Sequence, residues 1–181
     1  MLELSNHVLD IAQNSTAAGA ELVEIEIDED FENDLMTVVI RDDGCAMDEE
    51  ILKIAADPFV TTKAGKKVGL GLPLLAQAAM DAEGEFDISS TPGVGTTVTA
   101  SFRLSSVDRM PLGNMKSTML SLVFGAPEID FVYTRKRGER SYRFDTREVR
   151  NLGDGTMLSS AKTIQMVQSM LREEDEIFPE D

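Results

Sequence analysis

Residues 21–28 constrain the fold more than any other stretch, because aliphatic and acidic side chains alternate along them. Successive side chains of an extended strand point to opposite faces, so Val23, Ile25 and Ile27 would share one face. The carboxylates between them would then share the other face. Such a pattern predicts a half-buried strand and hence a sheet that is covered on one side only.

A helix is predicted on the N-terminal side of this strand, over residues 2–18. At 100° per residue, four of its side chains cluster on one side, namely Leu4, Val8, Ile11 and Ser15. Gly19 is a typical residue to end such a helix. A second stripe, which contains His7, Asp10 and Asn14, flanks the apolar one.

Further elements follow at short intervals along the chain. Three more strands are predicted over residues 35–41, 85–90 and 96–104, with a short helix after Asp48 and a longer one over 69–82. Beyond Ser105 we expect a helix at 114–124, strands at 129–135 and 140–145, and a helix at 158–173. Sequential strands with short links predict an α/β (α+β) two-layer sandwich with a mixed, mostly antiparallel sheet and helices on one face.

Composition restricts the class of protein and its compartment. With 17 Lys and Arg against 33 Asp and Glu, the formal net charge is −16, which argues against nucleic acid as a partner. The single cysteine, Cys45, excludes an internal disulfide. Apolar runs stay well short of the roughly 20 residues of a membrane span, and the N-terminus lacks the basic flank of a signal peptide. We therefore expect a cytoplasmic protein.

Asp10 and Asn14 are four residues apart on the first predicted helix, so both point in nearly the same direction. The Asn14 amide oxygen could bind Mg²⁺, and the Asp10 carboxylate could orient or deprotonate a water molecule. The same spacing also describes a polar helix edge that faces solvent, and the pair alone does not decide between the two.

Asp42 and Gly44 follow the second strand in the stretch Asp42-Asp43-Gly44-Cys45-Ala46-Met47. A carboxylate at a strand end can accept a hydrogen bond from the exocyclic amine of adenine. A neighbouring glycine lets the backbone approach a flat base. An ordinary Asp-Gly turn is the alternative interpretation of this stretch.

Glycines open the second long helix in the stretch 67–72 (KVGLGL). Bare amide groups at a helix N-terminus attract phosphate, although no Walker or Rossmann signature is present. The loop 58–63 (PFVTTK) offers hydroxyls and a lysine to a triphosphate, and Phe59 could anchor it. The last glycine-containing stretch is Gly95-Thr96-Thr97. Each of these could also be a surface loop or turn.

Together these five segments resemble the boxes of the GHKL ATPase superfamily, which includes histidine kinases, gyrase, MutL and heat-shock ATPase chaperones. The Asn14 segment resembles the N box, DDGCAM the G1 box, DPFVTTK the kinase F box, KVGLGL the G2 box and GTT the last box. The order is that of the family, and the resemblance covers about residues 3–104. It implies a Bergerat-type fold that binds ATP or ADP with Mg²⁺.

The resemblance also implies a role for each matching residue. Asn14 would hold Mg²⁺, Asp10 would be the catalytic residue, and Asp42 would bind the adenine amine. The remaining nucleotide contacts would come from Gly44, Ala46, Met47, Phe59, Thr62, Lys63, Gly69, Leu70, Gly71, Leu72 and Thr96 or Thr97. Thr62 and Lys63 would lie in a short lid over residues 60–68.

Two departures affect the expected activity. Ala46 replaces the second glycine of the G1 box, and Asp10 is one methylene shorter than the glutamate of MutL and gyrase. Hydrolysis is therefore less firmly implied than binding. The stretch around Asn14 is similar to MutL, whereas DPFVTTK and GLGL are similar to histidine kinases. We favour the kinase-like branch because these two matches are more specific.

The C-terminal half, residues 105–181, is expected to form an α/β extension to an ATP-binding domain at 1–104. Residues 135–150 carry seven arginines and lysines against three acids, a local excess of four positive charges. This stretch could be a docking face for an acidic protein or for a second copy of the chain. The alternative is a solvated hairpin whose arginines pair with nearby carboxylates.

The function expected from these observations is an ATPase or protein kinase of the histidine-kinase-like type, acting on a partner protein in trans. The only histidine, His7, lies inside the first helix, which argues against autophosphorylation in cis. A nucleotide-sensing module with little turnover and a MutL-like ATP-gated dimer are the alternatives.

Overall fold

The computed structural model describes residues 3–47, 52, 71–152 and 160–179. Its elements, in chain order, are α1 (Leu4–Ala17), β1 (Leu22–Asp30), β2 (Leu35–Asp42), α3 (Gly71–Asp81), β3 (Phe86–Thr91), β4 (Gly95–Arg103), α4 (Met115–Gly125), β5 (Asp130–Arg137), β6 (Arg140–Asp145), α5 (Thr146–Leu152) and α6 (Ala161–Ile177). The helix predicted after Asp48 lies outside the described residues, apart from Leu52.

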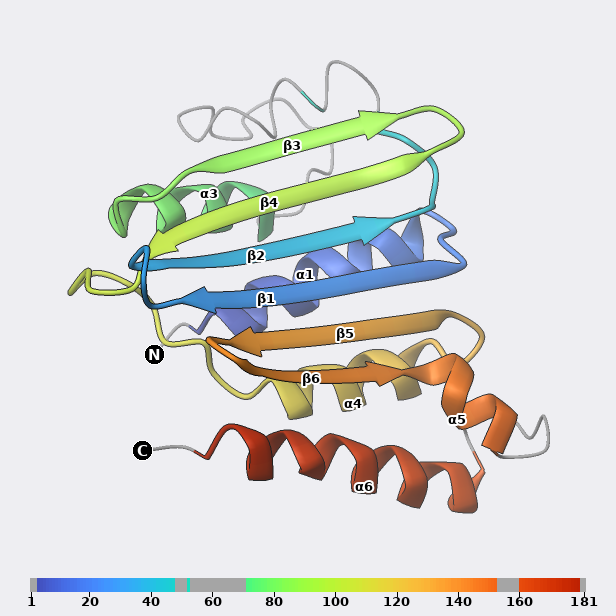
Figure 1. Cartoon of the computed structure of the whole chain (residues 1–181). Helices are drawn as coiled ribbons and strands as arrows, with labels where there is room; N and C mark the ends of the chain where they lie inside the picture. The colour runs from blue at the N-terminus through green and yellow to red at the C-terminus, as the bar shows by residue number, and fades with distance from the viewer. Residues whose placement is uncertain (1–2, 48–51, 53–70, 153–159, 180–181) are drawn as a thin grey trace.

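Six strands form one sheet in the order β3-β4-β2-β1-β5-β6 (Figure 1). Every neighbouring pair is antiparallel except β1 and β5, which run parallel. The predicted mixed, mostly antiparallel sheet is confirmed. The parallel pair joins two strands separated by about a hundred residues of sequence, so it determines how the two halves of the chain meet.

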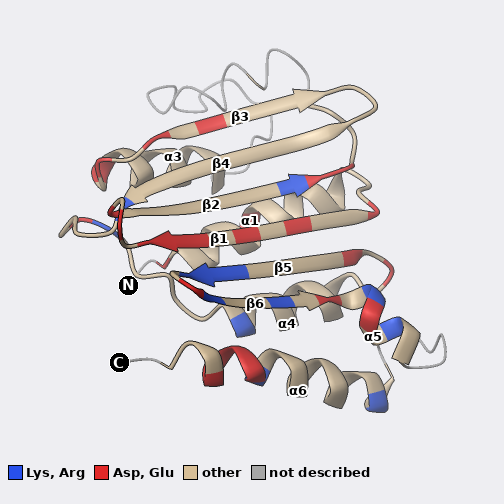
Figure 2. Cartoon of the chain, in the orientation of Figure 1, with Lys and Arg blue, Asp and Glu red and all other residues tan. Residues whose placement is uncertain are grey.

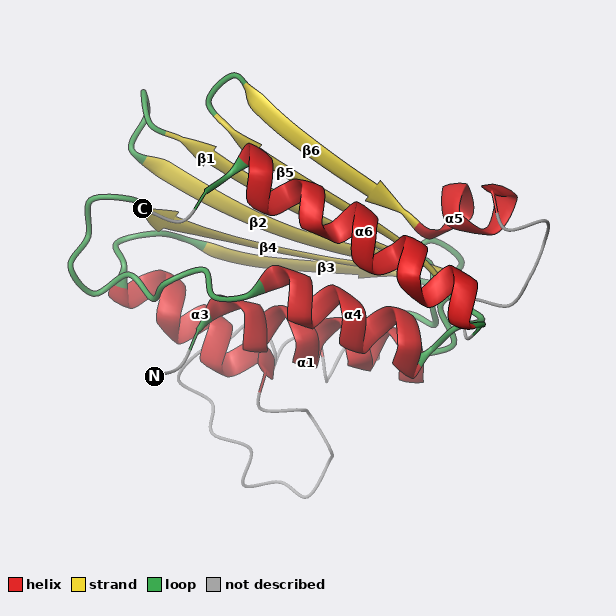
Figure 3. Cartoon of the chain, turned by 90° about the horizontal axis from the view of Figure 1, so that it is seen from below, coloured by secondary structure: helices red, strands yellow, loops and turns green. Residues whose placement is uncertain are grey.

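Helices α1, α3 and α4 lie side by side on one face of the sheet, and α6 lies along its β6 side (Figure 3). Val23, Ile25 and Ile27 of β1 point toward this layer and are at most 1% exposed, whereas the carboxylates between them are half-buried. No described helix covers the opposite face of the sheet (Figure 1). The alternation in β1 thus predicted the one-sided sandwich correctly.

Helix α1 is the central element of the helical layer, since it contacts both α3 and α4. The predicted row of Leu4, Val8, Ile11 and Ser15 is buried. Gly19 follows the helix with φ +76°, a conformation that favours glycine, as expected of the residue that ends it. The Thr118 hydroxyl of α4 donates to the carbonyl of Ser5 at 3.2 Å and fixes the N-terminal turn of α1.

The C-terminal half continues the same sheet, because β5 pairs with β1 along eight residue pairs. Helix α6 packs through Val167, Leu171 and Phe178, all buried. Helix α5 was not predicted; it begins where Asp145 accepts the amide proton of Arg147 at 2.9 Å. The division at residue 104 stays a prediction, with the sheet running without a break across it. Among the described residues, none of the helices combines the length and apolar character of a membrane span.

Candidate functional site

A pocket of about 50 Å³ opens between the C-terminal part of α1 and the end of β2. Its walls are largely apolar and come from four elements: Ile11, Ile40, Leu72 and Val98. Four polar side chains line it, those of Asn14, Ser15, Asp42 and Thr96. A narrow apolar slot with a few converging polar groups is suited to a flat heterocycle that carries hydrogen-bonding atoms on its edge.

The carboxylate of Asp42 is fixed by two donors at the base of this pocket. The Ser15 hydroxyl donates to Oδ2 at 2.5 Å, and the Gly44 amide donates to Oδ1 at 3.0 Å. Ser15 is buried, so this hydroxyl comes from the row of α1 side chains that faces the core. An ionised carboxylate has about four lone-pair directions, so both oxygens can still accept from a ligand.

Glycines allow the backbone to close around the end of β2. Gly95 has φ +120°, and a Cβ built on it would lie 1.8 Å from the Asp42 carbonyl oxygen. A Cβ on Gly44 would lie 3.2 Å from the Ala18 carbonyl oxygen, which accepts the Cys45 amide at 3.0 Å. The end of β2 is therefore attached to both β4 and the end of α1, and this attachment holds Asp42 in place.

The structure distinguishes the two candidate threonines of the last box. Thr96 is 5% exposed, is the cross-strand partner of Asp42 and lines the pocket. Thr97 pairs with Arg41 and lines a separate recess of about 260 Å³ on the uncovered face of the sheet. The two threonines therefore face opposite sides of the sheet, as consecutive strand residues do, and only Thr96 faces this pocket. A contact of Thr96 or Thr97 with the base stays a prediction.

Asn14 and Asp10 are both exposed, and the structure places them differently. Asn14 lines the pocket, whereas Asp10 lies beside the start of α3, where a Cβ on Gly71 would be 3.0 Å from the Asp10 Cβ. Within the described ranges no group of three or more His, Cys, Asp or Glu could hold a metal. A single amide ligand fits Mg²⁺ bound mainly through phosphates and water, as is usual for this ion.

Several other predicted site residues have a definite place in the structure. Leu72 lines the pocket, Gly71 packs on α1, and the Met47 amide donates to the Ser90 hydroxyl at 2.8 Å. Ala46 is half-buried. The lid and the outer phosphate contacts fall outside the described residues; these are Phe59, Thr62, Lys63, Gly69 and Leu70.

Two pocket residues had no role in the predicted nucleotide site, Ser15 and Cys45. The same holds for Ser90, which lies next to the pocket and bonds to Met47 and Thr96. The sequence could have indicated Ser15, because a buried hydroxyl on the apolar side of α1 needs a hydrogen-bond partner. For Ser90 and Cys45 no comparable signal exists, since their neighbours come from remote parts of the chain. Cys45 is exposed and lines the pocket.

His7 is 3% exposed, and its Nε2 has no hydrogen-bond partner within the part of the chain that the structure describes. Burial lowers the pKa of this imidazole below the ordinary value of 6.5, and the Asp10 carboxylate opposes the shift in part. The side chain therefore favours its neutral form and acts as part of the packing of α1.

The basic positions of residues 135–150 lie on β5, β6 and α5 (Figure 2). Most of them pair with carboxylates of the same chain. The half-buried Lys136 contacts Glu26 at 2.8 Å, and the largely buried Arg135 lies 3.1 Å from both Glu29 and Glu174. Arg137 reaches Glu29 at 4.0 Å. These contacts support the alternative of internally paired arginines over a free docking face.

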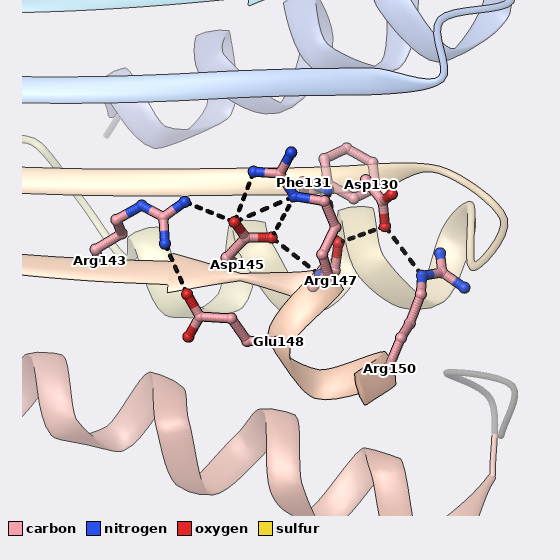
Figure 4. Close-up of polar contacts among 8 residues, drawn as sticks. Asp130, Phe131, Arg143, Asp145, Arg147, Glu148 and Arg150 are labelled. Carbon is pink, nitrogen blue, oxygen red and sulfur yellow. Dashed lines mark hydrogen bonds and ion pairs between the residues drawn. The ribbon is translucent and has the colours of Figure 1, made fainter. Parts of the chain in front are cut away.

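A second set of pairs surrounds Asp145, which is 3% exposed (Figure 4). Arg143 and Arg147 contact Asp145 Oδ2 at 2.6 Å and 2.7 Å. Arg150 contacts Asp130 at 2.9 Å and also donates to the carbonyl of Pro127 at 2.7 Å. These bonds hold the start of α5 against β5 and β6, so their primary effect is structural.

Comparison with known proteins identifies the class. The family of histidine kinase-, DNA gyrase B- and HSP90-like ATPases matches residues 1–106. Since this match covers more than half of the sequence, the chain belongs to that family. The predicted GHKL resemblance is confirmed.

Particular relatives lie mostly among sensor kinases. The chain is 32% identical over 108 residues to an inferred sensor protein of Shewanella frigidimarina, covering 59% of this chain and 16% of that protein. It is 36% identical over 69 residues to the signal transduction histidine-protein kinase AtoS of Escherichia coli, covering 38% and 11%. The chain thus spans less than a fifth of the length of these relatives.

A solved structure, the N-terminal domain of a DNA repair protein, has a similar fold with TM-score 0.50 and 15% identity. The match covers 79% of this chain and 52% of that one. At this identity the likeness concerns the fold alone. It extends well beyond residue 106, which agrees with the continuous sheet.

Proposed function

We propose that the protein binds Mg-ATP in the pocket between α1 and the end of β2. The observation that carries this proposal is the Asp42 carboxylate, held by Ser15 and Gly44 beside an apolar slot. A fixed acceptor of this kind suits the exocyclic amine of adenine, with Ile40 and Val98 against the base. The ligand class agrees with the family to which the chain belongs.

The start of α3 is the proposed position of the phosphates. Its first residues, Gly71 and Leu72, are buried against α1 and present a helix N-terminus near Asn14. Asn14 would give its amide oxygen to Mg²⁺. We also propose further phosphate contacts from Gly69, Leu70, Thr62 and Lys63 and an anchor at Phe59. These residues lie outside the described ranges, so their roles stay predictions.

The activity we propose is that of a protein kinase or ATP-dependent regulator that acts on a partner in trans. His7, the one histidine of the sequence, is 3% exposed and cannot be presented to a γ-phosphate without unfolding part of α1. The phosphoacceptor would therefore lie outside these 181 residues, and we propose that a partner protein carries it. Asp10, beside Gly71, would orient the attacking group.

The C-terminal half is the proposed contact surface for this partner or for a second copy. Its arginines are mostly engaged, which leaves the exposed acidic side of α6, with Glu173 and Glu176, as the charged feature available to a partner. We also propose a cytoplasmic location, which the requirement for ATP and the single exposed cysteine support.

A nucleotide sensor with little turnover is a second candidate. Asp10 is outside the residues that line the pocket, and it is shorter than glutamate, so a water molecule would be poorly oriented. The two candidates differ in phosphate release and in transfer of labelled γ-phosphate to a protein from the same lysate. A MutL-like dimer would instead associate when ATP is added, which sedimentation would detect.

Cys45 provides a direct test of binding, because it is the only cysteine and lies exposed in the pocket. Mg-ATP should slow its alkylation by a maleimide in a saturable manner, and calorimetry should give the same affinity. Alkylation of the denatured protein controls for the reagent. If millimolar Mg-ATP changes neither the labelling rate nor the heat, the proposal is wrong.

A further inference from the structure

Ser90 lies on β3 next to the pocket and belongs to none of the nucleotide segments considered above. Its hydroxyl accepts the Met47 amide proton at 2.8 Å and is 2.9 Å from the Thr96 hydroxyl. Both of these neighbours line the pocket, whereas Ser90 does not. We propose that Ser90 is a positioning residue that directs the Thr96 hydroxyl proton toward the bound base. This inference rests on the proposed function.

The hydroxyl protons of Ser90 and Thr96 have few acceptors within reach. Ser90 Oγ already accepts from Met47, and its own proton can go to Thr96 Oγ1 at 2.9 Å or to the Gly95 carbonyl at 3.5 Å. The shorter contact has the better hydrogen-bond geometry. When Ser90 donates to Thr96, the Thr96 proton is free, and an acceptor in the pocket would complete the chain of bonds.

Thr96 is only 5% exposed, so its hydroxyl has little contact with bulk solvent and depends on these hydrogen-bond partners. Among the described residues, Ser90 supplies the one side-chain hydrogen bond to Thr96 Oγ1. A ligand acceptor would satisfy the buried donor, as the great majority of buried polar groups in folded proteins require. Ser90 thereby determines whether Thr96 meets the ligand as a donor or as an acceptor.

Asp42 and Thr96 are cross-strand partners, so their side chains lie next to each other at the pocket. With Thr96 as a donor, the pair presents one acceptor beside one donor. Adenine carries the complementary arrangement, an amine at C6 beside the acceptor nitrogen N1. Guanine carries the reverse arrangement along this edge. Ser90 would therefore contribute to base selectivity without touching the base.

The test compares Ser90→Ala with Ser89→Ala in the full chain, using Mg-ATP and its 1-deaza analogue, which lacks the N1 acceptor. Ser89 is exposed on the opposite face and is the neighbouring residue, so it controls for the substitution itself. Affinities are measured by calorimetry, and thermal unfolding checks each fold. Ser90→Thr keeps the hydroxyl and tests rescue.

We expect Ser90→Ala to weaken ATP binding about 3- to 10-fold, the range of one neutral hydrogen bond, while 1-deaza-ATP binding changes less than about twofold. Ser89→Ala and Ser90→Thr should bind ATP as the wild type does. An equal loss for both nucleotides would indicate a merely structural role and overturn the inference, as would unchanged ATP affinity in Ser90→Ala.

Two further measurements keep the inference separate from the proposed function. If the wild-type protein does not bind ATP, the proposed function fails and the inference falls with it. If Ser90→Ala does not fold, the two nucleotides are compared on the wild-type protein alone. We expect it to bind ATP about 3- to 10-fold more tightly than the 1-deaza analogue. Equal wild-type affinities for the two nucleotides would refute the role given to Ser90.

Discussion

Replacing Asp42 by asparagine removes a charge while almost keeping the side-chain shape, so it tests the centre of the site. Oδ1 must remain an oxygen, because it accepts the Gly44 amide proton at 3.0 Å. The new amide nitrogen therefore occupies the position of Oδ2, next to the Ser15 hydroxyl. Ser15 can rotate and accept from it, so we expect the protein to remain folded.

The ligand cannot adjust in the same way, because an amide donor would now face the donating amine of adenine. Hydrogen bonds to charged groups contribute about 1.5–3 kcal/mol, so ATP should bind about 10- to 150-fold more weakly to Asp42→Asn. Calorimetry measures the affinity, and urea unfolding should show a change in stability of no more than about 1 kcal/mol, one neutral hydrogen bond.

Asp43→Asn is the matched control. Asp43 Oδ1 accepts the amide protons of Glu21 and Leu22 at 2.8 Å and 2.9 Å, contacts that an asparagine oxygen can retain. The same substitution one residue along should leave ATP affinity within about twofold of wild type, below the effect of one hydrogen bond. Wild-type affinity in a folded Asp42→Asn variant would refute the placement of the base.

Three other changes test the structure around the site. Gly95→Ala should destabilise the protein by about 3 kcal/mol in urea unfolding, because its Cβ would lie 1.8 Å from a backbone oxygen of β2; a loss under about 1 kcal/mol would contradict this packing. Arg135→Met should lower the free energy of unfolding by about 3 kcal/mol, since it leaves the buried Glu29 with Arg137 at 4.0 Å and the buried Glu174 with the Tyr133 hydroxyl at 2.7 Å; an unchanged stability would show that these remaining partners suffice. The pKa of His7 is lower in the folded protein than in the unfolded chain, so the unfolded chain binds the proton more readily. The free energy of unfolding should therefore have its full value above pH 6.5 and fall as the pH drops through the folded pKa. His7→Leu should flatten that part of the profile, and an unchanged profile would exclude His7 as the cause.

Much of the candidate site was predictable from local patterns. A carboxylate after a β-strand, glycines at a helix start and an asparagine on an amphipathic helix are visible along the chain, and Asp42, Asn14 and Leu72 do share one pocket. The sequence could also have shown which of Thr96 and Thr97 faces the core. Val98, Ala100 and Phe102 are apolar at even-numbered positions, so the core-facing threonine had to be Thr96.

The sequence by itself determined the elements and their buried faces, because the periodicity of apolar side chains is a local property of the chain. It could not determine that β5 would lie parallel to β1, or that Arg135 would reach Glu29 and Glu174. Those contacts join segments about 40 and 105 positions apart, and many pairings of similar charge and hydrophobicity compete for them.

Only the tertiary structure therefore decided that the arginines of residues 135–150 pair within the chain, that Ser15 lines the pocket and that Ser90 bonds to two residues that line it. The physical reason is that a hydrogen bond or ion pair depends on distances of about 3 Å between side chains. Such distances exist only after the sheet has brought its strands into register.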